Sequence, residues 1–317
     1  MINVGIIGLG KMGGYHANVC LQLHSLQAIK LVGVSDLNEK NLSKITAPFV
    51  IKSNDYKTWL YQVDAVIVAV PTDYHYPVAK ECLLAGKHVL LEKPITKNIA
   101  EAEELLALAA KLNLTLHVGH VERFNGAVQE LKKIIDNPLF IETHRMGPFA
   151  PRVEKDSVVL DLMIHDLDLL LMLVDSKVKS ISAQGQKVHT DSCDIVSVQL
   201  LFENGVIANL VASRASQVKE RTMTVHQKNE YIKLDFTTQD IAIHRQMNTS
   251  VQIGSDEMKY RQESLTERLF VYKDNPLKQE IEHFIKTVKT GNDTIDPEQN
   301  LTAIKLTFEI EKLLGIR

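Results

Sequence analysis

The pattern of hydrophobic and polar positions divides the chain into two parts that meet near residue 119. Before that point, short apolar, β-branched runs alternate with longer segments whose apolar positions recur at helical spacing. The apolar runs cover residues 2–8, 29–36, 65–70, 88–92 and 114–119. Such strands, separated by helices, are typical of a parallel sheet that helices cover on both faces. Residues 1–119 are therefore predicted to form a doubly wound α/β domain.

Residues 120–317 show a different pattern of apolar and polar positions. They are predicted to form an α+β domain with a large, mostly antiparallel sheet. Helical patterns at 126–136 and 156–171 flank a strand pattern at 140–146, and alternating runs follow. Asn204-Gly205 lies between two of these runs and is a strong hairpin signal. The C-terminal helix can pack back on the first domain. The polar segment 244–275 leaves three readings open: a mobile loop, an arm crossing to a partner subunit, or further strands.

Composition limits the possible functions. Hydrophobic residues are 45% and charged residues 24% of the chain, with a net charge of -3, which gives no support for nucleic-acid or anionic-membrane binding. Only three cysteines are present, far apart, so neither a disulfide framework nor a CxxC zinc site is expected. No basic leader and no apolar run of about 20 residues occurs. We expect a soluble, cytoplasmic protein without a metal site.

The first strand runs into the sequence GLGKMG, which fits the GxGxxG pattern of dinucleotide-binding turns. Gly8 permits a tight turn, Gly10 lets the backbone approach a pyrophosphate, and Gly13 lets helix and strand pack closely. The helix that follows offers free N–H groups to the phosphates. The pattern alone is weak evidence for dinucleotide binding. The strand before it, the helix after it and the acidic Asp36 at the end of the second strand strengthen this interpretation.

Asp36 favours NAD over NADP as the cofactor, because a carboxylate accepts hydrogen bonds from ribose hydroxyls and repels a 2′-phosphate. It could also cap the next helix. Since open α/β sheets bind ligands at the carboxyl ends of their strands, residues that follow other strands are further candidates. The predicted cofactor-binding residues are Gly8, Leu9, Gly10, Lys11, Met12, Gly13, Asp36, Pro71, Thr72, His75, Glu92 and Lys93. His75 could equally be a partly solvated histidine at a helix start.

The sequence LLEKPIT places Lys93 and Pro94 directly after an apolar strand. A lysine at this edge could hydrogen-bond a substrate hydroxyl beside a nicotinamide and favour its deprotonation. Pro94 could form a cis peptide bond that directs Lys93 into the cleft. The alternative is an ordinary strand end with a solvated lysine, and position alone does not separate the two.

The glycine turn, Asp36, the sequence EKP and a later Asp-xxx-His are together typical of one family, which the chain resembles over essentially its whole length. This is the glucose–fructose oxidoreductase, inositol dehydrogenase and rhizopine-catabolism family of NAD(P)-dependent oxidoreductases. The resemblance implies that Lys93 contacts both nicotinamide and the reacting hydroxyl. It also implies that Asp161 and His165 face the substrate, with His165 as general base. The alternative for this apolar helix is a satisfied buried network of Asp and His side chains.

The chain also departs from the family pattern at several positions. Lys155, Asp156 and Ser157 stand where a glycine run is common, Met163 replaces a glycine, and Gly126 stands where many members have proline. These changes leave the Lys-Asp-His set intact but weaken a simple analogy with inositol or glucose enzymes.

The substrate suggested by the resemblance is a UDP-linked N-acetylglucosamine oxidised at its 3-hydroxyl. Arg123, Arg145 and Arg152 are candidate contacts to its diphosphate, although loop arginines are often merely solvated. Three alternatives stay open: a free-sugar or polyol dehydrogenase, an NAD-assisted glycoside-cleaving enzyme, and a non-catalytic NAD-binding redox regulator. Because the family's large sheet commonly packs against another subunit, the resemblance implies a homodimer or homotetramer.

Overall fold

The computed structural model describes residues 1–150, 157–253, 257–292 and 295–316, with the backbone alone for 247–253 and 257–263. Contacts divide the chain into two compact units, each with its own core. The first unit contains Met1–Val121 and Asn275–Lys305, and the second contains Glu122–Asp274 and Leu306–Arg317. Helix α9 (Pro297–Leu313) contributes residues to both. No helix in the described ranges is long and apolar enough to span a membrane.

The first unit is built on a six-stranded sheet with the order β3-β2-β1-β4-β5-β6, and every pair in it is parallel. This confirms the predicted doubly wound fold. The strands are β1 (Ile2–Ile7), β2 (Ile29–Ser35), β3 (Ile51–Ser53), β4 (Ala65–Val68), β5 (His88–Glu92) and β6 (Leu116–Gly119). Strand β3 is absent from the sequence prediction, since its three residues form no apolar run.

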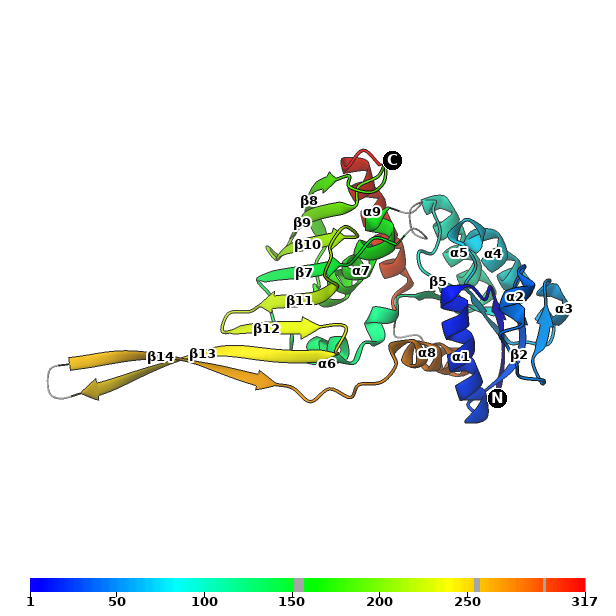
Figure 1. Cartoon of the computed structure of the whole chain (residues 1–317), viewed down its shortest axis with the longest axis horizontal. Helices are drawn as coiled ribbons and strands as arrows, with labels where there is room; N and C mark the ends of the chain where they lie inside the picture. Colours follow the sequence, from blue (N-terminus) through cyan, green and yellow to red (C-terminus); the bar gives the residue numbers. More distant parts are fainter. Residues whose placement is uncertain (151–156, 254–256, 293–294, 317) are drawn as a thin grey trace. The chain divides into compact units, whose positions relative to one another are not determined.

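Helices lie on both faces of this sheet (Figure 1). On one face, α8 (Pro276–Thr290) packs against α1 (Lys11–Ser25), and its Ile281 and Phe284 join the core beside β1 and β2. The other helices of this unit are α2 (Glu39–Leu42), α3 (Lys57–Leu60), α4 (His75–Leu84) and α5 (Ile99–Leu112). Asn98 is the N-cap of α5, since its side chain accepts a hydrogen bond of 2.8 Å from the Ala100 N–H.

The second unit contains an eight-stranded sheet with the order β14-β13-β12-β11-β7-β10-β9-β8. Among the described strands of this sheet only β7 and β10 pair in parallel, so the sheet is mostly antiparallel, as predicted. Helices α6 (Gly126–Ile134) and α7 (Ile164–Leu173) contribute apolar residues to its core. The strands are β7 (Phe140–Met146), β8 (Val178–Gln186), β9 (Ile195–Phe202), β10 (Ile207–Ser213), β11 (Glu220–His226), β12 (Glu230–Asp235), β13 (Asp240–Ile253) and β14 (Glu257–Arg268).

The polar segment 244–275, which the sequence left open, forms most of a long antiparallel hairpin. Strands β13 and β14 pair from Ala242 with Arg268 to Ile253 with Glu257. Strand β12 pairs with β13 only over Asp240–Arg245, so the rest of the hairpin continues as a two-stranded ribbon (Figure 1). Of the readings left open, the structure therefore favours strands.

Candidate functional site

The glycine turn has the local geometry that its sequence requires. Gly8 has a φ of +90°, and a Cβ there would meet the Ala69 carbonyl oxygen at 2.6 Å. A Cβ on Gly13 would lie 1.9 Å from the Gly8 carbonyl oxygen, so helix α1 can approach the turn only with glycine at this position. At Gly10, by contrast, a Cβ would meet no described atom within 4 Å, which leaves open space beside the backbone.

This turn leads into a helix start that is suited to an anion. Gly10 is the N-cap of α1 and provides no side-chain cap, and the first turn has no acidic residue. The helix N-terminus therefore presents N–H groups and a partial positive charge. Lys11 and Met12 begin α1 and are exposed, while Leu9 is buried. The residues present thus fit the pyrophosphate of a dinucleotide.

Asp36, directly after β2, is tied to the glycine turn. Its Oδ2 accepts a hydrogen bond of 2.6 Å from the Leu9 N–H, and its Oδ1 accepts one of 2.7 Å from the Asn38 N–H. Helix α2 is capped by the side chain of Asn38 and not by Asp36, in contrast to the alternative role considered for Asp36. The Asp36 carboxylate is thus held beside the turn and can accept further hydrogen bonds.

The ends of β1, β4 and β5 bring the remaining candidates of this unit to one edge. Ile7 pairs with Val68, and Val68 pairs with Leu91, so these strands end at the same level. Gly8, Pro71 and Lys93 follow them. The Lys93–Pro94 peptide bond is cis, in agreement with the suggestion from the sequence.

His75 begins α4 as predicted, but its ring is buried and engaged by the backbone. Its Nδ1 lies 2.8 Å from the Pro94 carbonyl oxygen, and its Nε2 lies 3.0 Å from that of Val70. Burial lowers the pKa of His75, although the neighbouring carbonyls oppose this effect. A neutral imidazole can donate to only one of the two carbonyls. The ring therefore braces the turns that follow β4 and β5, and the predicted cofactor contact and the solvated alternative are both disfavoured.

Glu92 forms a contact that the sequence did not reveal. Its Oε1 lies 2.6 Å from Nε2 of His16 in α1, and both side chains are buried, at 9% and 0% exposure. Burial alone would raise the pKa of Glu92, but the hydrogen bond from His16 and the charges of His16, Lys93 and His75 outweigh it and lower the pKa. The carboxylate thus faces α1, which departs from the predicted direct cofactor contact.

In the second unit, Asp161 and His165 lie at the start of an irregular helix. Ser157 caps it, since its Oγ accepts a hydrogen bond of 3.0 Å from the Leu160 N–H. Residues Val159–Met163 form one π-helical turn before α7 begins, so the helical pattern at 156–171 is not a regular α-helix between Asp161 and His165. Such turns often occur at functional sites. Both side chains are partly exposed.

The other two acids of this helix are buried and paired with arginines. Arg145 donates three bonds of 3.1, 3.0 and 2.8 Å to Asp166 and one of 2.8 Å to Glu122. Arg123 donates to both oxygens of Asp168. The interpretation of the helix as a satisfied buried network is therefore right for Asp166 and Asp168, whereas Asp161 and His165 are partly exposed.

These pairings bear on the diphosphate contacts suggested for Arg123 and Arg145. Arg145 lies in β7, as the strand pattern at 140–146 predicts, and the side chains of Arg123 and Arg145 are only 4% and 2% exposed. Burial alone would lower the pKa of Arg145, but Asp166 and Glu122 outweigh it and raise the pKa. Guanidinium groups held by buried carboxylates are poorly placed to bind a diphosphate, so a structural role is favoured. Arg152 lies outside the described residues.

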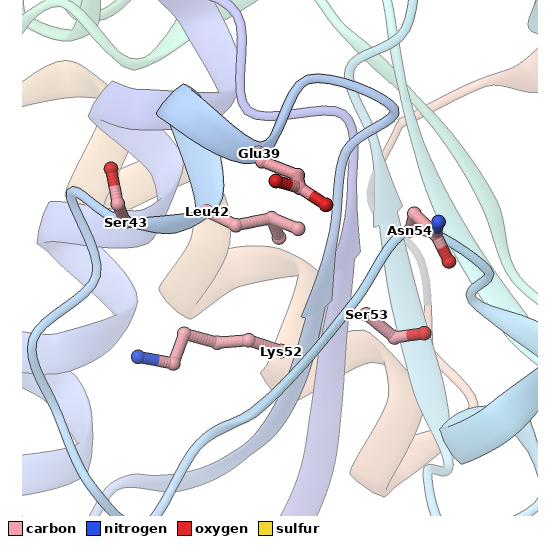
Figure 2. A pocket seen from close by; sticks show the side chains of 6 residues that line it. All are labelled: Glu39, Leu42, Ser43, Lys52, Ser53 and Asn54. Carbon is pink, nitrogen blue, oxygen red and sulfur yellow. The ribbon is translucent and has the colours of Figure 1, made fainter.

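A hollow of about 440 Å³ lies between α2 and β3 in the first unit. Figure 2 shows Glu39, Leu42 and Lys52 around it, together with Ser43, Ser53 and Asn54. Glu39 follows Asp36 by three positions, so the hollow adjoins the predicted ribose-binding turn. Its lining, as far as the structure describes it, does not include Lys93.

Comparison with known proteins adds to this geometry. The family model described as "oxidoreductase family, NAD-binding Rossmann fold" matches residues 2–120, and that of the GFO/IDH/MocA C-terminal domain matches residues 128–233. UDP-N-acetylglucosamine 3-dehydrogenase from Acidithiobacillus ferrooxidans is 33% identical over 245 residues, 77% of each chain. The chain belongs to the GFO/IDH/MocA family of oxidoreductases.

One solved structure and one further relative are similar to this GFO/IDH/MocA chain over nearly its whole length. A solved structure of the Acidithiobacillus ferrooxidans enzyme has a TM-score of 0.88 and 28% identity, covering 99% of this chain and 98% of that one. Myo-inositol 2-dehydrogenase from Thermotoga maritima is 24% identical, covering 99% of this chain and 96% of the relative. The chain is thus an oxidoreductase with an NAD-binding Rossmann domain, and its relatives act on different substrates.

Proposed function

We propose that this protein is an NAD-dependent dehydrogenase that oxidises the 3-hydroxyl of the N-acetylglucosamine unit of UDP-N-acetylglucosamine. The observation that carries the proposal is the similarity to the Acidithiobacillus ferrooxidans enzyme, which holds in sequence over 77% of the chain and in fold over 99%. The inositol dehydrogenase, at 24% identity, is a more distant relative.

Lys93, Asp161 and His165 are the proposed catalytic residues. Lys93 follows the strand end aligned with the glycine turn, and Asp161 and His165 are partly exposed on a helix whose other acids are buried against arginines. His165 accepts the proton of the substrate hydroxyl, and the ammonium group of Lys93 stabilises the negative charge that develops on the oxygen. Asp161 orients the substrate or His165. Bound NAD supplies the acceptor for the hydride that leaves the same carbon, which becomes a carbonyl.

Asp36 supports NAD as the preferred cofactor. Its carboxylate is fixed at the turn by the N–H groups of Leu9 and Asn38, so its negative charge stays where a 2′-phosphate would lie. The proposed cofactor contacts are the glycine turn, Asp36 and the residues that follow β4 and β5.

We also propose that the protein is a homodimer or homotetramer. Burial alternates along β9, so one side of the large sheet carries the core while the other is exposed, with Ile195 and Ile207 each more than one-third exposed. A sheet face with apolar positions of this kind suits contact with a second copy. Light scattering of the purified protein gives the subunit number directly.

A free polyol is the second candidate substrate, favoured by the full-length similarity to myo-inositol 2-dehydrogenase. The deciding experiment offers cofactor-stripped protein NAD with UDP-N-acetylglucosamine, free N-acetylglucosamine or myo-inositol and follows nicotinamide reduction. We expect turnover with the nucleotide sugar alone. With substrate deuterated at C3, the label should appear in the reduced cofactor, whereas label at C4 should not.

Turnover with inositol alone would contradict the nucleotide-sugar assignment and leave the proposed catalytic residues in place. Cleavage of the glycosidic bond without net cofactor reduction would instead indicate transient oxidation followed by elimination.

A further inference from the structure

The buried pair of His16 and Glu92 connects the two elements on which the proposed cofactor site depends. His16 lies in α1, the helix that begins at the glycine turn, and Glu92 ends β5 immediately before Lys93. The two residues are 76 positions apart in sequence, and Nε2 and Oε1 are separated by 2.6 Å. A short contact between a ring nitrogen and a carboxylate away from water is a strong hydrogen bond.

The direction of this hydrogen bond follows from the charge of Glu92. Since the pKa of Glu92 is lowered, the carboxylate is ionised near neutral pH and can only accept. Nε2 of His16 must therefore carry the hydrogen. Nδ1 of His16 is buried and has no hydrogen-bond partner among the described residues. The hydrogen bond that the His16 ring makes through Nε2 thus goes to Glu92.

The surroundings hold the carboxylate in one position. Gly119 pairs with Glu92 across β5 and β6, and a Cβ on Gly119 would lie 3.3 Å from both Cα and Oε2 of Glu92. The side chain therefore lies tightly between β6 and α1. His75, from the start of α4, and Lys93, from the turn after β5, are the other charged or titratable groups whose attraction Glu92 feels.

We propose that His16 is a positioning residue for Lys93. It holds the Glu92 carboxylate beside Lys93, so that a fixed negative charge accompanies the ammonium group and the end of β5 is tied to the helix that binds the pyrophosphate. The inference rests on the proposed catalytic role of Lys93. Neither the family comparison nor the sequence motif assigns this role to His16.

Four variants test the proposal. His16→Leu removes the hydrogen-bond donor, and Glu92→Gln removes the charge. His16→Gln keeps an N–H donor near the position of Nε2. Leu23→Ala is the matched control, because Leu23 is a buried core residue of the same helix and its truncation lowers stability by core loss alone.

The first readout needs no substrate. It is the rate at which a lysine-selective reagent acetylates Lys93, measured by mass spectrometry of the peptide that contains it. Exposed Lys111 is the internal reference. We expect acetylation several-fold faster in both variants, because Glu92→Gln removes the negative charge beside Lys93 and His16→Leu removes the hydrogen bond that holds that carboxylate in place. His16→Gln and Leu23→Ala should match the wild type. Equal rates in all five proteins would overturn the proposal.

The second readout is turnover with the substrate that reduces NAD in the wild type. His16→Leu should lower kcat by about tenfold to a hundredfold, the range for a misplaced catalytic group, while the NAD dissociation constant changes by less than about threefold. The acid limb of the pH profile of kcat in this variant should move to higher pH, because Glu92 loses the hydrogen bond that lowers its pKa. Loss of melting temperature alone, with kcat unchanged, would mean that the pair is only structural. A wild type without turnover would refute the proposed function and leave the acetylation test valid.

Discussion

The backbone N–H of Leu9 donates a hydrogen bond of 2.6 Å to the carboxylate of Asp36. This bond joins the glycine turn after β1 to the residue that follows β2, so the proposed phosphate-binding turn and the proposed ribose ligand are directly linked. The same carboxylate also accepts from Asn38 and, at 3.2 Å, from the side chain of Asn41. Cofactor choice is therefore expected to depend on Asp36 both through its charge and through the turn that it supports.

Replacement of Asp36 by serine should weaken the binding of NAD and allow NADP to bind. A hydrogen bond to a charged group is worth about 1.5–3 kcal/mol, so the KM for NAD should rise about tenfold or more. The KM for NADP should fall in the same variant, because the repulsion of its 2′-phosphate is lost. Steady-state kinetics with both cofactors measure the two effects. Glu39→Gln, on the same segment, should change neither, and an unchanged NAD preference in the serine variant would refute the assignment.

Replacement of Lys93 by methionine should remove turnover while NAD still binds. General acid–base and electrostatic help from one side chain contributes about 10²–10⁴-fold, and kcat should fall by that range. Fluorescence titration with NADH should give a dissociation constant near that of the wild type. Lys111→Met, at the exposed end of α5, is the matched control. A variant that keeps most of its rate would show that Lys93 is an ordinary strand-end lysine.

The Arg145–Asp166 pair should be needed for stability, not for substrate affinity. Arg145→Met leaves Asp166 buried without its partner, which typically costs about 3–5 kcal/mol. Urea unfolding followed by circular dichroism measures the loss, since Trp59 lies in the other unit and does not report on this one. The double variant with Asp166→Leu should lose less than the sum of the single changes. An unchanged midpoint accompanied by a large rise in substrate KM would instead restore the diphosphate role.

Cys20 and Cys82 should resist thiol reagents in the native protein. Burial raises the pKa of each to about 12, so almost no thiolate forms at pH 8, and neither side chain is accessible. A colorimetric thiol assay should detect rapid reaction only after denaturant is added. Fast labelling of either cysteine without denaturant would show that α1 or α4 opens readily.

The sequence predicted the elements whose signals are local. The apolar runs that form β1, β2, β4, β5 and β6 each depend on a few neighbouring residues. Family resemblance and strand-end position together selected Lys93, and the structure aligns its strand with the glycine turn.

Contacts between distant residues could not be predicted in this way. Nothing in the residues around His16 indicates a partner 76 positions away, and nothing around Arg123 or Arg145 separates a buried ion pair from a phosphate ligand. The π-helical turn before α7 could not be predicted either, since an apolar pattern at helical spacing does not distinguish a single π-helical turn from a regular α-helix. These features depend on tertiary packing, which decides how each local preference is used.

The lowered pKa of Glu92 predicts a specific pH dependence of stability. A carboxyl whose folded pKa lies below its unfolded value stabilises the fold above the unfolded pKa, about 4.3 for Glu, and loses that contribution as pH falls through the folded pKa. Wild type should therefore exceed Glu92→Gln in free energy of unfolding at pH 7, and the difference should shrink below about pH 4. Urea unfolding of both proteins across this range, read by the fluorescence of Trp59 in the same unit, measures it. A difference that grows on acidification would mean that Glu92 is protonated in the native protein, and the direction assigned to its bond with His16 would then be reversed.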